Sequence, residues 1–131
     1  MIEAEILDAI GDDNGDGSRL NAIADQFRNG REISEILRLL DSNNAELVSI
    51  GAWLLGELPF DFYASDEFVS RVRKLVEHPD SSVRFHALGA LFPALDAQDD
   101  ATRVLLCKLR HDPNEGVRMA AEATATRLGV P

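Results

Sequence analysis

The sequence predicts an all-α protein, a short α-solenoid of about four antiparallel helix pairs, and three observations support this. Apolar residues recur at spacings of three and four, which is the period of a helix, and no long window alternates apolar and polar residues. Residue types that start helices precede these apolar stripes. Similar segments also return at intervals of 34–36 residues, the length of a two-helix repeat.

The apolar stripes and the start signals together place eight helices. In "SDEFVSRVRKLVEH", Ser65 is a capping residue type, acids occupy the first turn, and apolar residues follow at helical spacing. Asp112 is likewise a capping type ahead of Pro113, which suits a first helical position. The expected helices span residues 2–10, 18–28, 31–41, 45–58, 66–77, 80–95, 99–110 and 114–128.

Three stretches align as repeats: "LLDSNNAELVSIGAWLLGEL" from Leu39, "LVEHPDSSVRFHALGALFPAL" from Leu75 and "LRHDPNEGVRMAAEATATRL" from Leu109. A leucine ends the first helix of each, and a polar turn follows. One aligned column is apolar, the next holds arginine twice, and a third holds only small residues, which let two helices approach closely. These columns are Leu47, Val83 and Val117; Val48, Arg84 and Arg118; and Gly51, Ala87 and Ala121.

The segments "DPNEGVRMAAEA" and "HPDSSVRFHALGAL" resemble the HEAT-repeat family in their turn, their Val-Arg pair and the small residue that follows. The resemblance covers about Arg31 to Leu128, and the first repeat departs from it at Asn43 and Val48. It implies a right-handed HEAT/armadillo-like superhelix forming a single domain over residues 1–131. Within that domain we expect divergent capping helices in 1–30 and repeats at 31–59, 66–96 and 99–129.

The charge balance narrows the class of partner. The 131 residues include 13 basic and 23 acidic ones, for a net charge of −10. Such a chain repels nucleic-acid phosphates and anionic lipid and attracts a basic protein. With one cysteine and no secretory pattern at the N-terminus, the expectation is a cytoplasmic protein without a nucleic-acid or membrane partner. The oligomeric state stays open.

The segment "GDDNGDGSRL" matches the first half of an EF-hand calcium loop, with Asp12, Asn14 and Asp16 at ligand positions. The match fails later, because Ile23 occupies the position that needs a bidentate glutamate. We therefore expect an acidic turn followed by a helix capped by Ser18, and we expect no metal and no cofactor.

The turns within consecutive helix pairs would lie along one edge of the protein. Acidic residues from these turns would then form a partner-binding edge that steers a basic partner. Its expected members are Asp12, Asp13, Asp16, Asp41, Asp80, Asp112 and Glu115. By resemblance to HEAT-like repeats, Arg84 and Arg118 are expected to form a structural ladder with acids of the turns, and Asp80 and Asp112 are candidate partners.

A second candidate surface is a stripe along the second helices of the repeats. Trp53, Phe85, Phe92 and Met119 belong to this stripe and could form an apolar patch in a partner-binding groove. The alternative is packing between repeats, for example Trp53 covering Gly89. The loop "PFDFYASD" adds Phe62 and Tyr63, which either tuck under the core or contact a partner.

No motif of an enzyme site is present, so no enzyme is expected and no catalytic residue is assigned. The chain has no glycine-rich phosphate loop, GxSxG or HExxH. The histidines lack metal-ligand spacing. Cys107 lies beside Val104 and Leu105 in an expected helix, so a buried, inert thiol is expected.

The expected function is protein binding. The segment "ELVSIGAWLLGELPF" is similar to segments of bacterial HEAT-like immunity proteins. This resemblance implies an acidic immunity protein of a toxin–antitoxin system, which occludes a basic bacterial toxin. The alternatives are a HEAT-like lyase or other enzyme-associated subunit, and an adaptor in a larger complex.

Overall fold

The computed structural model describes residues 1–12 and 17–131, with the side chain of Asp12 excepted. This part of the chain forms eight α-helices and no strand, so the all-α prediction is confirmed. The helices are α1 (Ile2–Asp12), α2 (Ser18–Arg28), α3 (Ser34–Leu40), α4 (Ala45–Gly56), α5 (Asp66–Leu75), α6 (Ser81–Leu91), α7 (Asp100–Leu109) and α8 (Glu115–Leu128). Two short 3₁₀ helices, η1 (Phe60–Phe62) and η2 (Phe92–Ala94), lie in the connections.

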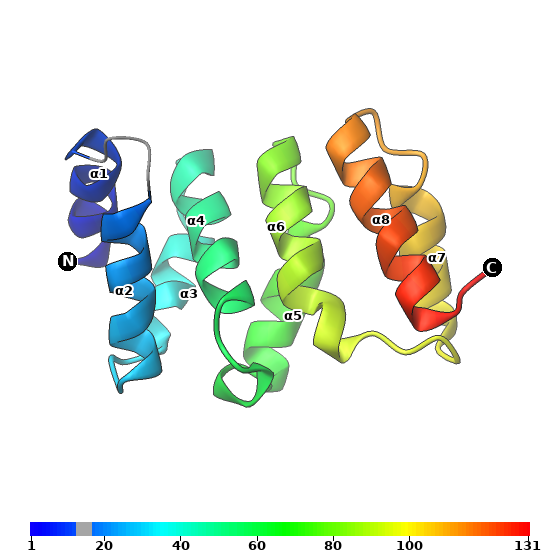
Figure 1. The fold of residues 1–131 in the computed structure, drawn as a ribbon, viewed down its shortest axis with the longest axis horizontal. Helices are drawn as coiled ribbons and strands as arrows, with labels where there is room; N and C mark the ends of the chain where they lie inside the picture. Colours follow the sequence, from blue (N-terminus) through cyan, green and yellow to red (C-terminus); the bar gives the residue numbers. More distant parts are fainter. Residues whose placement is uncertain (13–16) are drawn as a thin grey trace.

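The helices are arranged in two layers, with consecutive helices paired across them. Figure 1 shows α2, α4, α6 and α8 in the front layer, and the pairs follow one another along the long axis, with the two termini at opposite ends. The turns within the last three pairs lie at the upper end of this view, and the connections between pairs lie at the lower end. Neighbouring pairs join mainly through α4 against α6 and α6 against α8.

Small residues set the distance between the helices of a pair. Gly51, Ala87 and Ala121 are all buried. A methyl group added at Gly51 would lie 2.9 Å from Cβ of Leu39, closer than real side chains approach. The small-residue column of the repeat therefore marks where the second helix meets the first, as its position in the sequence predicts.

The repeat is also visible in the capping hydrogen bonds. Asn44, Asp80 and Asn114 are the N-caps of α4, α6 and α8, and the side chain of each accepts from backbone amides of its own helix. Two residues before each cap, a side-chain atom accepts the N–H of the cap residue, at 2.9–3.0 Å. These atoms are Ser42 Oγ, His78 Nδ1 and Asp112 Oδ1.

Three local predictions need correction. Asn114 is the cap of α8, so Pro113 precedes the cap and is not in the first helical position. The helix expected over residues 80–95 ends at Leu91 and continues as η2, because Pro93 has no N–H to donate. The helix expected from residue 31 begins at Ser34, because the N–H groups of Glu35 and Ile36 donate three residues back, to the carbonyl oxygens of Glu32 and Ile33, as in a turn.

Candidate functional site

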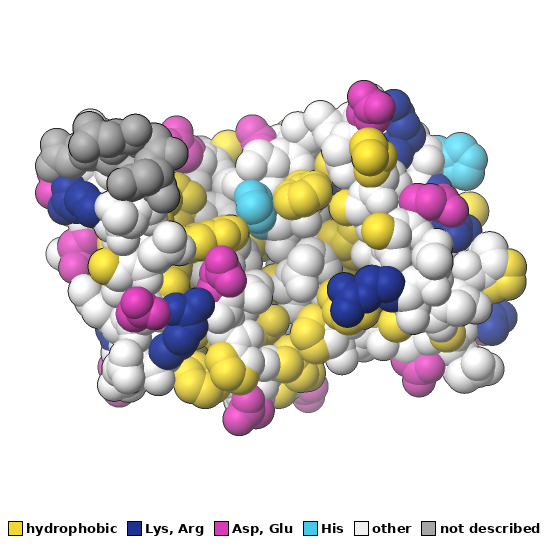
Figure 2. All heavy atoms as spheres, in the orientation of Figure 1, with side chains coloured by type: hydrophobic (Ala, Val, Ile, Leu, Met, Phe, Trp, Pro, Cys, Tyr) yellow, Lys and Arg dark blue, Asp and Glu magenta, His cyan; other side chains and the backbone are white. Residues whose placement is uncertain are grey.

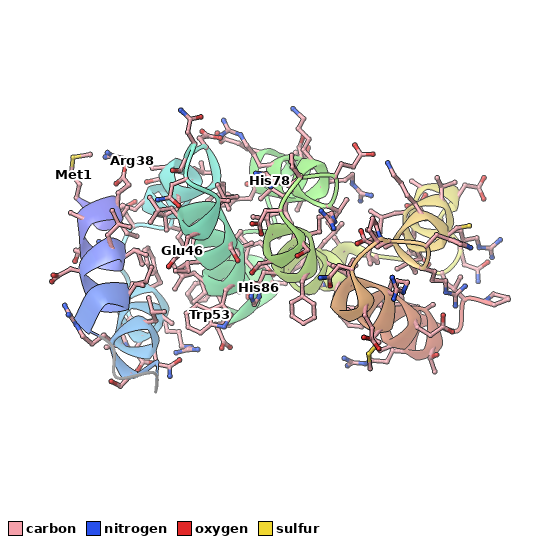
Figure 3. The ribbon with its side chains drawn as sticks, turned by 90° about the horizontal axis from the view of Figure 1, so that it is seen from above. Met1, Arg38, Glu46, Trp53, His78 and His86 are labelled. Carbon is pink, nitrogen blue, oxygen red and sulfur yellow. The ribbon has the colours of Figure 1, made fainter. Side chains whose placement is uncertain are left out.

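A groove crosses the front layer between α4, α6 and α8. Seen from above, α2 and α8 project beyond α4 and α6, so the face is hollowed in its middle, where Trp53 and His86 lie (Figure 3). The groove has a volume of about 410 Å³. Its walls are mostly apolar, and they comprise Ala52, Trp53, Gly56, Glu57, Phe85, His86, Leu88, Gly89, Ala120 and Thr124.

Two aromatic side chains dominate this groove. Trp53 is half-buried, whereas Phe85 is 43% exposed, which is unusual for so large an apolar ring. A methyl group added at Gly89 would meet no atom within 4 Å. The space directly over Gly89 is thus open and Trp53 does not cover it, although Trp53 packs partly against the core.

A polar recess of about 370 Å³ adjoins the groove at the N-terminal ends of α4 and α6. Its lining includes Glu46 and Asp80, together with Ser49 and Ser82, whose hydroxyl oxygens lie 2.8 Å apart. His86 lines both the recess and the groove. Glu46, Asp80 and Glu57 make the combined lining acidic, and it contains neither lysine nor arginine.

His86 stands between the apolar and the acidic part of this surface. Burial lowers the pKa of its imidazole below the usual value, because the charged form loses hydration. The Phe85 ring lies edge-on against the His86 ring, with 5.2 Å between their centroids. The neutral imidazole is therefore the form that the folded protein favours.

The predicted apolar residues are not all brought together. Trp53 and Phe85 line the groove, but Met119 and Phe92 do not. Met119 is 64% exposed on α8, and Phe92 is half-buried beneath the Arg127 guanidinium, 4.7 Å from the ring centroid. Helix α8 contributes Ala120 and Thr124 to the groove instead of the predicted Met119.

The two partner-contact candidates in the loop between α4 and α5, Phe62 and Tyr63, differ in their exposure. Phe62 is 38% exposed, as a partner contact requires. Tyr63 is only 2% exposed, and its hydroxyl donates to the Ala90 carbonyl oxygen at 2.8 Å. Its assignment to a partner-binding surface is wrong, because a partner cannot reach its ring.

The expected acidic edge is smaller than the sequence suggested. Asp41 is exposed and pairs with Arg71, and Glu115 is exposed at the start of α8. Asp80 is half-buried and caps α6. Asp112 is only 7% exposed and bonds internally, so it is not an edge residue. Asp13 and Asp16 lie outside the described residues, and so does the side chain of Asp12.

In the arginine column of the sequence repeat, Arg84 connects α6 to the turn before α8. Nε and Nη2 of Arg84 donate to the two carboxylate oxygens of Asp112, each at 2.8 Å. Arg118 makes no such pair with a described residue, and its Nη1 instead donates to backbone carbonyls of its own turn, those of Asp112 and Pro113. Among the described residues, the expected ladder thus has one ionic link, between Arg84 and Asp112.

Two smaller expectations concern cysteine and metal. Cys107 is exposed on α7, so the expectation of a buried thiol is wrong. Within residues 1–12 and 17–131, no three histidine, cysteine or acidic side chains come together in a way that could hold a metal ion.

Comparisons with known proteins gave no relative: no family model, no curated protein and no solved structure matches the chain. Among the helices described, none combines the length and the apolar character needed to cross a bilayer.

Proposed function

We propose that the protein is a non-catalytic protein-binding domain, a short right-handed HEAT-type solenoid that receives its partner in the groove between α4, α6 and α8. The observation that carries the proposal is the pairing of an exposed Phe85 with the half-buried Trp53 around open space. Aromatic side chains that keep apolar area in solvent lose that hydration when a partner covers them. Trp in particular is favoured at the centre of protein interfaces.

The solenoid part of the proposal rests on the repeated local structure. The N-caps of α4, α6 and α8, the acceptors two residues before them and the buried small residues recur with the sequence repeat. The side-by-side succession of helix pairs in Figure 1 is the arrangement that stacked two-helix repeats produce.

The partner should present a basic residue next to an apolar one. Glu57 lies in the groove, and Glu46 and Asp80 lie in the adjoining recess, so the surface offers carboxylates at both ends of an apolar floor. Figure 2 shows yellow apolar side chains in the hollow with acidic side chains at several points around it. The overall charge of −10 would speed the approach of a basic partner and make the encounter sensitive to salt.

A particular form of this proposal is an immunity protein that acts in the cytoplasm. In that form, the groove and its acidic surroundings cover the basic cleft of a bacterial toxin and exclude its substrate. The supporting features are the acidic recess and the net negative charge of this protein. Both would complement the basic cleft of a toxin that acts on a phosphate-containing substrate.

Affinity capture from the native host, followed by mass spectrometry, tests this function. We expect recovery of a basic protein that is released as the salt concentration rises. Matched capture with Phe85→Ser, which removes the exposed ring, should lose that protein. Recovery of no basic partner, or equal recovery by the Phe85→Ser variant, would contradict the proposal.

A further inference from the structure

Arg84 and Arg118 have the same anchoring in successive repeats. Nη1 of Arg84 donates to the carbonyl oxygens of His78 and Pro79, both at 2.9 Å. Nη1 of Arg118 donates to the carbonyl oxygens of Asp112 and Pro113, at 2.7 and 3.0 Å. In both cases the acceptors lie six and five residues before the arginine, so each guanidinium is held against its own turn in the same way.

The two arginines differ at the opposite edge of the guanidinium. Nε and Nη2 of Arg84 hold the Asp112 carboxylate. Within the described residues, no acceptor bonds with Nε or Nη2 of Arg118, although the side chain is partly buried.

No neighbouring acidic side chain bonds with Nε or Nη2 of Arg118 within the described residues. Glu122 lies 3.1 Å from Arg110 Nε, and Glu115 forms no ion pair with a described residue. The carbonyl oxygens of Val130 and Pro131 accept from Arg110, so the last residues of the chain are held there and not at Arg118.

A guanidinium fixed in this way is well suited to bind a carboxylate. Two backbone acceptors already hold its orientation, so little side-chain entropy remains to be lost when a ligand binds. The free Nε–Nη2 edge has the donor spacing that matches two carboxylate oxygens. Arg84 demonstrates that match in the same protein, with the same anchors and with both bonds at 2.8 Å.

We propose that Arg118 is a binding site for a carboxylate, supplied by an aspartate or glutamate side chain of a partner protein that packs against the α7–α8 end. This site is independent of the groove, which is lined by other residues and attracts the opposite charge. It would position a partner at the end of the row of helices as Asp112 positions α8 against α6.

Nuclear magnetic resonance of the arginine Nε–H groups tests the site, with acetate as the probe and chloride at equal ionic strength as the reference. We expect the Arg118 Nε–H signal to move on addition of acetate, saturably and towards the position of the Arg84 signal. The Arg84 signal should stay in place because its edge is occupied by Asp112. Arg38 is exposed and its Nε–H bonds with no described acceptor, so its signal measures the unspecific response to acetate.

The variant Arg118→Lys keeps the charge and lacks the two-donor edge, so acetate should then leave the backbone signals of residues 112–118 unchanged. The proposal is overturned if acetate moves the Arg118 signal no further than that of Arg38. It is also overturned if phosphate moves the signal further than acetate, since the site would then prefer another anion. A signal that moves on simple dilution of the protein would assign the site to a second copy of the chain instead of a separate partner.

Discussion

The guanidinium of Arg84 holds both carboxylate oxygens of Asp112, with Nε and Nη2 each 2.8 Å from an oxygen. The Arg84 and Asp112 side chains are 13% and 6% exposed, so this is the most buried ion pair in the described part of the chain. It connects α6 to the turn before α8. The same carboxylate accepts the N–H of Asn114, so one side chain both joins two repeats and shapes the second turn.

Removing Arg84 should weaken the fold markedly. Arg84→Ala leaves a largely buried carboxylate without its counter-charge, and we expect the free energy of unfolding to fall by roughly 3 kcal/mol. Urea unfolding followed by circular dichroism measures it. Arg71→Ala is the matched control, because it breaks a solvent-exposed pair with Asp41 and should change stability little. Equal effects of the two substitutions would contradict this account of the ladder.

Acid should remove the contribution of this pair. The Arg84 guanidinium, together with the Asn114 amide, lowers the pKa of the Asp112 carboxyl against the opposing effect of burial. A carboxyl whose pKa is lowered by folding stabilises the protein above its unfolded value, near 4, and this contribution is lost as pH falls through the folded pKa. The stability difference between wild type and Asp112→Asn should therefore be constant near neutrality and shrink below about pH 4. A difference that stays constant down to pH 2 would exclude such a pKa shift.

Two glycines should respond in opposite ways to the same substitution. Gly51→Ala places a methyl group 2.9 Å from Leu39 Cβ, so we expect a loss of about 1–3 kcal/mol from overpacking between α3 and α4. Gly89→Ala meets no atom within 4 Å and replaces a glycine inside α6, so a gain of about 0.5–1 kcal/mol is expected. Thermal unfolding of both variants gives the comparison, and stabilisation by Gly51→Ala would contradict the close approach of α3 and α4.

Tyr63 offers a direct spectroscopic check, because it is the single tyrosine of the chain. Burial raises the pKa of its phenol to about 12, since the ionised form would lose hydration. Folding therefore favours the neutral phenol, and the protein should lose stability as pH rises above the unfolded value of about 10. Ultraviolet absorption should show tyrosinate appearing near pH 12 in the folded protein and near 10 in urea. Ionisation near 10 without denaturant would place the ring in solvent.

Much of the fold could be predicted from spacing and end signals. Apolar periodicity and helix caps depend on residues near one another in the sequence, so the eight helices were found with boundary errors of a few residues. The larger errors occur where local chemistry overrides periodicity, as at Pro93, and where a helix begins with a turn, as before Ser34. The small residues of the repeat predicted a close helix contact, and Gly51 shows that contact.

The candidate site was predicted less completely, because exposure depends on distant residues. Of the predicted stripe, Trp53 and Phe85 line the groove, whereas Phe92 and Met119 do not. The sequence does not show that Tyr63 reaches the Ala90 carbonyl, 27 residues away, or that Arg127 covers Phe92. His86 was overlooked as a groove residue, although it directly follows Phe85 on a helix already assigned to that face.

The central claim, that the groove binds a protein partner, is tested most directly by filling the groove. Gly89→Trp places a large side chain in the open space beside Trp53 and Phe85 without displacing a described atom near its Cβ. The matched control is Val104→Trp, at a 68% exposed position on α7 outside the groove lining. The dissociation constant of the captured partner should rise at least about tenfold for Gly89→Trp, equivalent to about 1.4 kcal/mol, and stay unchanged for Val104→Trp. Undiminished affinity of a folded Gly89→Trp variant would contradict the assignment of the groove as the binding site.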